Sequence, residues 1–210
     1  MEVTYLGMNC VRLTGKDISV ICDPFPKSSG LAEVKLANDV TLLSQDGLGV
    51  PQKPGMILDS PGEYEVKGTM ITGIPAKLHI DHEKEGDNST IYTVNIDGIR
   101  VAFLGNIAPE LKDKQLEAMG EVDVLVIPVG GHGLTLDATA AAQIISHIEP
   151  KYVIPTHYDD GKVKYEMPQD KLDVFMKEVG STSEPQPKLR VLQKDLPLET
   201  TVAVLQPQGQ

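Results

Sequence analysis

The sequence predicts a mixed α/β (α+β) fold, in which two β-sheets pack face to face and helices cover their outer faces. The first half holds short β-branched and apolar runs separated by glycine and proline turns, which is a pattern of consecutive strands. In the second half, strands alternate with helical segments, and the apolar run Val122–Val129 is typical of a strand buried on both faces. Two packed sheets with outer helices satisfy this pattern, as do other α/β or α+β layouts.

Size and composition indicate one domain of residues 1–205, with a tail of residues 206–210 that is expected to fray. Hydrophobic residues make up 40% of the chain and charged residues 23%, as in ordinary soluble proteins. The net charge of −11 argues against nucleic-acid or anionic-membrane partners, which require basic patches. No apolar run is long enough to span a membrane, and Met1 leads directly into a strand. A cytoplasmic location is therefore expected.

Turn signals divide the first hundred residues into strands. Pro and Gly residues between positions 51 and 62 mark turns, and Asp97-Gly98 is a strong two-residue hairpin signal. The expected strands are Glu2–Leu6, Cys10–Leu13, Ile18–Cys22, Val40–Leu43, Met56–Leu58, one or two within Gly62–Ile74, Thr90–Ile96 and Arg100–Leu104.

Helical spacing appears after Asn106. It predicts a helix over Ala108–Met119 and an Ala-rich helix over Asp137–Ile148, with Pro150 just beyond its end. The remaining expected elements are a short helix over Lys171–Val179 and strands over Val122–Val129, Tyr152–Pro155, Lys188–Leu192 and Thr200–Leu205.

The two cysteines do not suggest a disulfide framework. If Gly15–Asp17 forms a three-residue hairpin loop, Cys10 lies opposite Cys22 and a cross-strand disulfide is conceivable. Two reduced, buried thiols are the expectation in a reducing cytoplasm.

Five parts of the sequence carry a family resemblance. They are Tyr5–Cys10 with Ile21–Phe25, Pro61–Glu65 with Ile71–His79, Val101–Asn106, Val122–Gly131 and Val153–Tyr158. In this order and spacing they resemble the branch of the metallo-β-lactamase superfamily that contains L-ascorbate-6-phosphate-lactonase-like proteins and small zinc-dependent hydrolases. The resemblance implies a four-layer αββα sandwich, in which metal-bound hydroxide performs hydrolysis.

The metal-binding loop of that superfamily reads Thr-His-x-His-x-Asp-His after a strand. Aligning Ser44 with its Thr places Gln45, Gly47, Gly49 and Val50 at the four ligand positions. Glycine and valine offer no donor side chain, and a glutamine amide is a poor zinc ligand. The resemblance therefore implies a hydrolase frame whose metal loop has been emptied.

The other ligand positions are partly retained. His157 ends a buried strand where the resemblance places the last ligand, and His79 matches the histidine of the third motif. Asn106 replaces the bridging Asp, and an amide cannot supply the negative charge that two dications share. Since catalytic zinc takes three protein ligands, two imidazoles should hold it loosely.

Other residues offer a way to rebuild a site. The candidate pool is Glu63, His79, Asp81, His82, His132 and His157. His132 lies in a flexible glycine turn at a strand end, so a regrouped site from His79, His82, His132 and His157 is one alternative. The other is that His79 and His82 lie in a solvated acidic loop.

Two further residues have structural interpretations. His147 is expected to stabilise the end of the Ala-rich helix through the helix dipole. Asp23 is expected to cap a local turn rather than to touch substrate. No Gly-x-Ser-x-Gly elbow, Walker loop or dinucleotide fingerprint is present.

Two functions follow. The favoured hypothesis is a non-catalytic binding or assembly protein with no resident metal, whose partner is a small molecule or a protein, with a homo-oligomer as one form of assembly. The alternative is an active hydrolase of a small anionic ester, lactone or phosphoester, using zinc or another divalent metal in a rearranged single-metal site. Nuclease activity is disfavoured by the acidic charge and the emptied loop.

Overall fold

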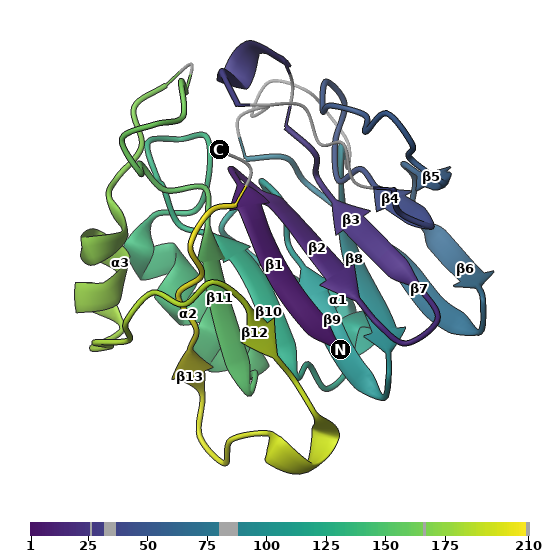
Figure 1. Ribbon diagram of the computed structural model, residues 1–210. Helices are drawn as coiled ribbons and strands as arrows, with labels where there is room; N and C mark the ends of the chain where they lie inside the picture. Colours follow the sequence, from purple (N-terminus) through teal and green to yellow (C-terminus); the bar gives the residue numbers. More distant parts are fainter. Residues whose placement is uncertain (26, 32–36, 80–87, 166, 209–210) are drawn as a thin grey trace.

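The computed structural model describes residues 1–25, 27–31, 37–79, 88–165 and 167–208. In these parts of the chain, two β-sheets pack face to face, as the sequence predicted (Figure 1). The six-stranded sheet has the order β12-β1-β2-β3-β4-β5, and the seven-stranded sheet has the order β13-β11-β10-β9-β8-β7-β6. Two packed sheets are the centre of the sandwich that the resemblance implies.

The strand bounds match the predicted runs closely. The six-stranded sheet contains β1 (Glu2–Gly7), β2 (Cys10–Thr14), β3 (Ser19–Cys22), β4 (Val40–Leu42), β5 (Met56–Leu58) and β12 (Leu189–Arg190). The seven-stranded sheet contains β6 (Gly62–Val66), β7 (Thr69–Ala76), β8 (Ser89–Ile96), β9 (Ile99–Phe103), β10 (Val124–Pro128), β11 (Tyr152–Thr156) and β13 (Thr201–Val202).

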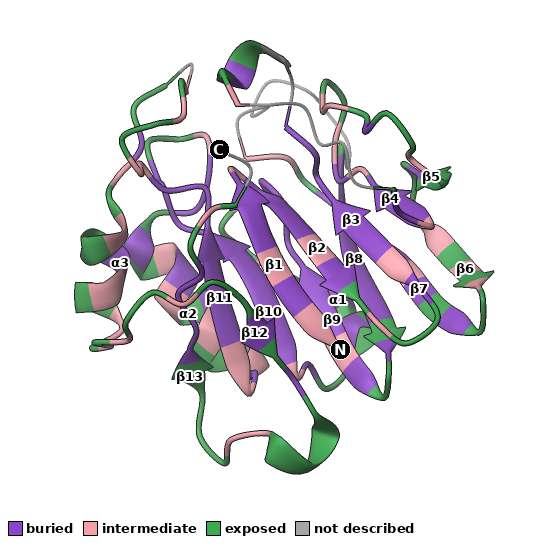
Figure 2. Cartoon of the chain, viewed as in Figure 1, coloured by how far each residue is buried: buried purple, intermediate pink, exposed green. Residues whose placement is uncertain are grey.

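The core lies between the sheets and beneath the helices. Every residue of β10 is buried, which agrees with its continuous apolar sequence, and all residues of β8 but one are buried as well (Figure 2). Tyr5 and Leu13 from one sheet and Tyr92 and Phe103 from the other are among the largest fully buried side chains of this core. The two sheets therefore form one rigid frame for the loops at their edge.

Three α-helices occur in the described residues: α1 (Asp113–Met119), α2 (Ala138–Ile148) and α3 (Leu172–Glu178). Asp137 caps α2, because its side chain accepts a hydrogen bond from the backbone of Ala140. The buried residues Ala138, Ala141 and Ile144 recur at helical spacing and face the core. Short 3₁₀ turns span Lys27–Ser29 and Gln193–Asp195. No helix of the described ranges is long and apolar enough to span a membrane.

The three described helices lie against the seven-stranded sheet (Figure 1). Helix α1 contacts β7, and α2 packs with α3 beside the β10–β11 side of the seven-stranded sheet (Figure 1). The fourth, helical layer predicted over the six-stranded sheet is not found among the described residues. Residues 32–36, which connect β3 to β4, lie outside them.

Helix α1 begins five residues later than predicted. The backbone N–H of Ala108 donates to the carbonyl of Lys77 at 2.8 Å, and Ile107 forms a β-bridge with Leu78. These pairings hold the chain extended before Asp113, so tertiary contacts override the local helical spacing.

The chain end also differs from the prediction. The backbone N–H of Gln206 donates to Gln186 and that of Gln208 donates to Tyr5, each at 2.9 Å. Hydrogen bonds to the frame therefore hold the tail as far as Gln208, and residues 209–210 lie outside the described part of the chain.

The predicted opposition of the two cysteines is wrong. Gly15 donates its N–H to Ile18, so the β2–β3 loop is one residue shorter than expected and Val11 lies opposite Cys22. A shift of one residue turns a side chain to the other face of a sheet. Cys22 accordingly packs between the sheets, Cys10 packs in a separate cluster with Phe25, and both are free thiols. The Asp97-Gly98 hairpin, in contrast, is confirmed by the pairing of β8 with β9.

Candidate functional site

The predicted site residues gather where strands end at one edge of the sandwich. Asp23 follows β3, Gln45 follows β4, Asn106 follows β9 and His157 follows β11, while Asn9 comes from the β1–β2 turn. All five line a cavity of about 180 Å³. The other lining residues are Met8, Phe25, Ser28, Ser29, Gly47, Leu48, Leu134, Lys164 and Tyr165. Ligand sites of α/β proteins form at such carboxyl ends of strands.

Three of the seven non-glycine residues with positive φ among the described residues line this cavity. Met8, Asp23 and His157 have φ angles of 51°, 47° and 55°, in the left-handed region that L-residues avoid. Each such residue costs about 1–3 kcal/mol and persists only where surrounding bonds hold it. Here the N–H of His157 donates to the carbonyl of Met8, and the N–H of Asp23 donates to that of Leu42. Strain of this kind is typical of binding and active sites.

An amide network fills the position of the bridging ligand. Nδ2 of Asn9 donates to Oδ1 of Asn106 at 2.7 Å, and the Thr156 hydroxyl donates to Oδ1 of Asn9 at 3.1 Å. All three side chains are buried. The carbonyl oxygen of Asn106 is thus already engaged, and its Nδ2 remains as a hydrogen-bond donor.

Asp23 links the end of β3 to the segment that follows β4 through two hydrogen bonds with Ser44. Its Oδ1 accepts from the backbone N–H of Ser44 at 2.8 Å, and its Oδ2 accepts from the Ser44 hydroxyl at 2.7 Å. The predicted local turn cap is therefore wrong, because the partner lies 21 residues away. Burial raises the pKa of Asp23 to about 6, although the two bonds from Ser44 act in the opposite direction.

Gln169 fixes the tautomer of His157. Nε2 of Gln169 donates to the carbonyls of Met167 and Pro168, so its Oε1 is the acceptor that faces Nδ1 of His157 at 3.2 Å. His157 therefore carries its proton on Nδ1, and Nε2 is left as an acceptor. Burial lowers the pKa of His157 to about 4, so the imidazole is neutral at pH 7. The Tyr165 ring lies 4.8 Å from it, centroid to centroid.

The structure separates the other histidines. The N–H of His79 donates to the carbonyl of Asn106 at 2.8 Å, so His79 adjoins the site through its backbone. His132 lies 3.0 Å from Asp170, and both side chains are substantially exposed. His147 lies in the last turn of α2, as predicted. Glu63 is exposed on the edge strand β6. Asp81 and His82 lie outside the described residues.

The loop Gln45–Val50 is docked in a conformation that excludes a side chain at Gly49. The N–H of Gly49 donates to the carbonyl of Pro24 at 2.8 Å. A Cβ atom on Gly49 would lie 2.1 Å from the carbonyl oxygen of Phe25, far inside van der Waals contact. Gln45 and Gly47 line the cavity, whereas Val50 is exposed.

These residues do not fit a divalent metal ion. Among the described residues, no three His, Cys, Asp or Glu side chains are grouped so that they could share one. The described lining residues include one imidazole, His157, and one carboxyl group, Asp23, together with neutral amides and Lys164. A catalytic zinc site takes three protein ligands, usually His or carboxylate.

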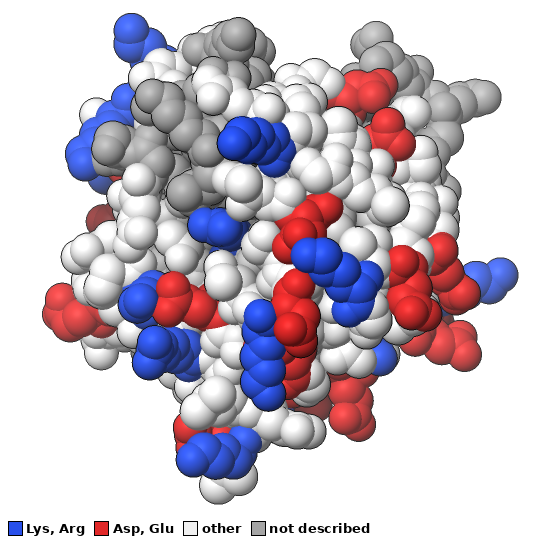
Figure 3. All heavy atoms as spheres, turned by 45° about the vertical axis from the view of Figure 1, so that its right-hand side comes forward, with Lys and Arg blue, Asp and Glu red and all other residues white. Residues whose placement is uncertain are grey.

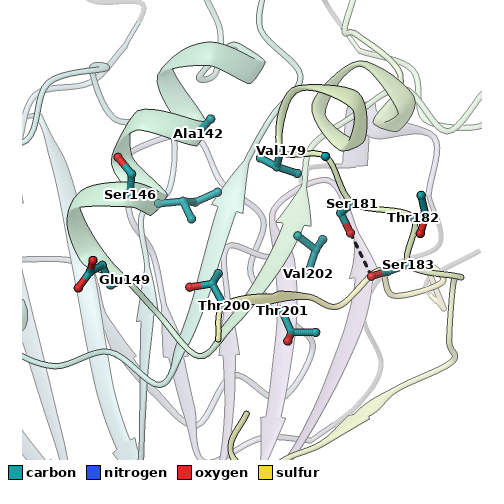
Figure 4. A pocket seen from close by; sticks show the side chains of 12 residues that line it. Ala142, Ser146, Glu149, Val179, Ser181, Thr182, Ser183, Thr200, Thr201 and Val202 are labelled. Atoms are coloured by element: carbon teal, nitrogen blue, oxygen red, sulfur yellow. Dashed lines mark hydrogen bonds between the residues drawn. The ribbon is translucent and has the colours of Figure 1, made fainter. Parts of the chain in front are cut away.

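A second, more open groove of about 760 Å³ lies between the ends of α2 and α3 and strand β13 (Figure 4). Hydroxyl groups dominate its polar lining, with Glu149 as the one ionisable side chain among the described lining residues. It contains none of the predicted site residues. We therefore assign the functional site to the smaller cavity.

Sequence reasoning missed several lining residues. Asn9 lies in the Tyr5–Cys10 segment, but its role depends on Asn106 and Thr156, which are distant in the sequence. Lys164 lines the cavity and Gln169 contacts His157, and both belong to the loop after His157. That loop has no periodic pattern, so only the three-dimensional structure brings the two residues to their places.

Comparisons with known proteins agree with this architecture. The beta-lactamase superfamily domain model matches residues 2–157. A UPF0173 metal-dependent hydrolase of Thermococcus onnurineus is 29% identical over 193 residues, which cover 76% of this chain and 85% of the relative. A UPF0173 metal-dependent hydrolase of Natranaerobius thermophilus is 25% identical over 192 residues, which cover 76% of this chain and 84% of the relative.

Solved structures give the same result. A Thermotoga maritima protein assigned as a Zn-dependent hydrolase of the metallo-beta-lactamase superfamily aligns with a TM-score of 0.79 and 27% identity over 98% of both chains. A metallo hydrolase of Ignicoccus hospitalis aligns with a TM-score of 0.66 and 17% identity, over 98% of this chain and 95% of its own, and shows the shared fold.

Proposed function

The chain belongs to the beta-lactamase superfamily, among relatives named metal-dependent hydrolases, and from this premise we propose that it is a non-catalytic member of the fold. It binds a ligand, either a small molecule or a segment of a partner protein, in the cavity at the strand ends. It holds no resident metal ion.

The hydrogen bond between Asn9 and Asn106 is the observation that carries this proposal. A bridging carboxylate must direct its oxygens at the ion and add negative charge. In this chain the oxygen at that position accepts from Asn9 at 2.7 Å, within a buried network that also includes Thr156. A dication at this position would meet a neutral amide pair rather than the negative charge of a bridging carboxylate.

The surroundings of His157 support the same conclusion. Of the described histidines, His157 alone lines the cavity, while His132 is paired with Asp170. The docked backbone at Gly49 leaves no room for a ligand side chain. Metal-assisted hydrolysis needs protein ligands that hold the ion, and the described lining residues include one imidazole and one carboxyl group for that purpose.

Acidic charge supports a partner other than nucleic acid. On the face drawn in Figure 3, Lys and Arg side chains stand among Asp and Glu rather than in a continuous patch. Together with a net charge of −11, this arrangement disfavours a polyanion. We also propose a cytoplasmic location, in line with two free, buried thiols.

The names of the relatives favour one alternative, a hydrolase that uses a single metal ion. His79 adjoins Asn106 through a backbone hydrogen bond, so it is the described histidine best placed to join His157 in such a site. This alternative requires a third ligand.

Elemental analysis decides between the two. The full chain is purified without chelator beside the Thermotoga maritima relative, and zinc, manganese and iron are quantified in both. We expect far less than one equivalent of metal in this protein and no turnover of phosphoester, lactone or ester substrates. One equivalent of tightly held metal, removed by chelator together with activity, would establish the alternative.

A further inference from the structure

The polar groups of the cavity form a complementary set of donors and acceptors. We propose that its ligand is a small, uncharged carboxamide carried on a planar ring. The inference rests on the proposed function, because it assumes that no metal ion occupies the same space.

The acceptors of the cavity need a donor from the ligand. Gln45 lines the cavity, and its Oε1 is buried with no hydrogen-bond partner among the described residues. His157 lines the same cavity with an unprotonated Nε2, because Gln169 holds the proton on Nδ1. The NH₂ group of a carboxamide can donate to acceptors of both kinds.

The donors of the cavity need an acceptor from the ligand. The Oδ1 of Asn106 is taken by Asn9, which leaves the Nδ2 of Asn106 as the available donor. Lys164 also lines the cavity, and its side chain carries an ammonium donor. A carboxamide oxygen can accept from these donors.

The cavity favours an uncharged carboxamide over a carboxylate as its ligand. A carboxylate offers acceptors alone, so it would leave Oε1 of Gln45 and Nε2 of His157 without a donor. It would also share the cavity with the buried carboxyl group of Asp23. A dianionic phosphoester would also leave these acceptors without a donor. It would bring two negative charges next to Asp23, with Lys164 as the one lysine among the described lining residues.

Size and wall chemistry favour a ring. The cavity volume of about 180 Å³ is close to that of an apolar protein cavity of ~150 Å³ that holds benzene. The walls include the aromatic rings of Phe25 and Tyr165 and the apolar side chains of Met8, Leu48 and Leu134. Aromatic walls favour a planar ring, and the amides at the strand ends fix its polar substituent.

Nicotinamide and nicotinate test the proposal, because they share size and ring and differ in the carboxamide against the carboxylate. Each is titrated into the full chain at pH 7.5 by calorimetry, on samples whose metal content is measured. We expect nicotinamide to bind at least tenfold more tightly than nicotinate. Equal or reversed affinities, or no nicotinamide binding at 10 mM, would overturn the proposal.

Variants locate the binding. Gln45→Leu removes the unpartnered acceptor from a partly exposed side chain and should weaken nicotinamide binding at least tenfold, whereas Ser146→Ala, in the groove of Figure 4, should leave it unchanged. Unchanged binding in Gln45→Leu places the ligand elsewhere and refutes the site. A metal-free sample that prefers nicotinate refutes this inference alone, whereas a metal-loaded, hydrolytic sample refutes the proposed function.

Discussion

Asn9 donates a hydrogen bond of 2.7 Å to Asn106, a residue 97 positions later in the chain, across the cavity at the strand ends. The bond joins the β1–β2 hairpin of one sheet to the segment that follows β9 in the other. It therefore contributes to the stability of the sandwich and also fixes two amide groups of the site. A carboxylate at position 106 would bring charge to this place, whereas the amide pair is neutral.

Replacing Asn9 should destabilise the fold. Asn9→Ala leaves the Oδ1 of Asn106 and the hydroxyl of Thr156 without their buried partner, at a cost of about 1–3 kcal/mol in the free energy of unfolding. Urea denaturation measures the change. Asn95→Ala is the matched control, because Asn95 is an exposed residue of β8. Equal unfolding free energies of the two variants would show that the amide network does not stabilise the fold.

Asp23 and His157 should give opposite pH dependences of stability. The pKa of Asp23 is raised from 3.8 to about 6, so the folded state binds the proton more tightly, and this contribution falls as pH rises from 4 to 6. The pKa of His157 is lowered from 6.5 to about 4, so its contribution is complete above pH 6.5 and is lost as pH falls toward 4.

The two effects offset each other in the parent protein. Between pH 4.5 and 6, each changes the unfolding free energy by up to about 1.4 kcal/mol per pH unit, with opposite signs. His157→Asn, which tolerates the left-handed backbone, should make stability fall as pH rises through this window. Asp23→Asn should make it rise. Denaturation at several pH values checks both slopes, and the same slope in both variants would contradict the assignment.

Gln169 should control the proton position on His157. With the amide of Gln169 anchored by Met167 and Pro168, ¹⁵N shifts of the imidazole should report the Nδ1–H tautomer between pH 6 and 8. Gln169→Leu removes the acceptor and should mix the tautomers. An Nε2–H tautomer in the parent protein would show that Gln169 does not position the ring.

The docked loop should resist a side chain at one glycine and accept it at another. Gly49→Ala forces a Cβ atom to 2.1 Å from the Phe25 carbonyl, so it should cost about 1–3 kcal/mol or displace the loop. Gly47→Asn is the control, because the described atoms leave open space within 4 Å of it and Asn tolerates its φ of 80°. Chemical denaturation compares them, and a smaller cost at position 49 would contradict the docking.

Much of the frame could be predicted because its signals are local. Asp97-Gly98 determined a hairpin register, the apolar run of β10 indicated burial on both faces, and Asp137 marked the start of α2. The placement of Gln45, Asn106 and His157 at one site came from the family resemblance, and the three residues do line one cavity.

One error has a local cause, and the others have long-range causes. One residue in the β2–β3 loop decided which face Cys10 occupies, and the pairing of Ala108 with Lys77 delayed α1. The role of Asp23 depends on Ser44 and that of His157 depends on Gln169, so neither follows from neighbours in the sequence. The donor and acceptor pattern of the cavity exists only once these pairs have formed.

A crystal structure grown with excess zinc tests the central claim most directly. Anomalous diffraction at the zinc edge should reveal no ion in the cavity, with the Asn9–Asn106 hydrogen bond intact. An anomalous peak there, within bonding distance of His157 and at least two further side chains, would contradict the account.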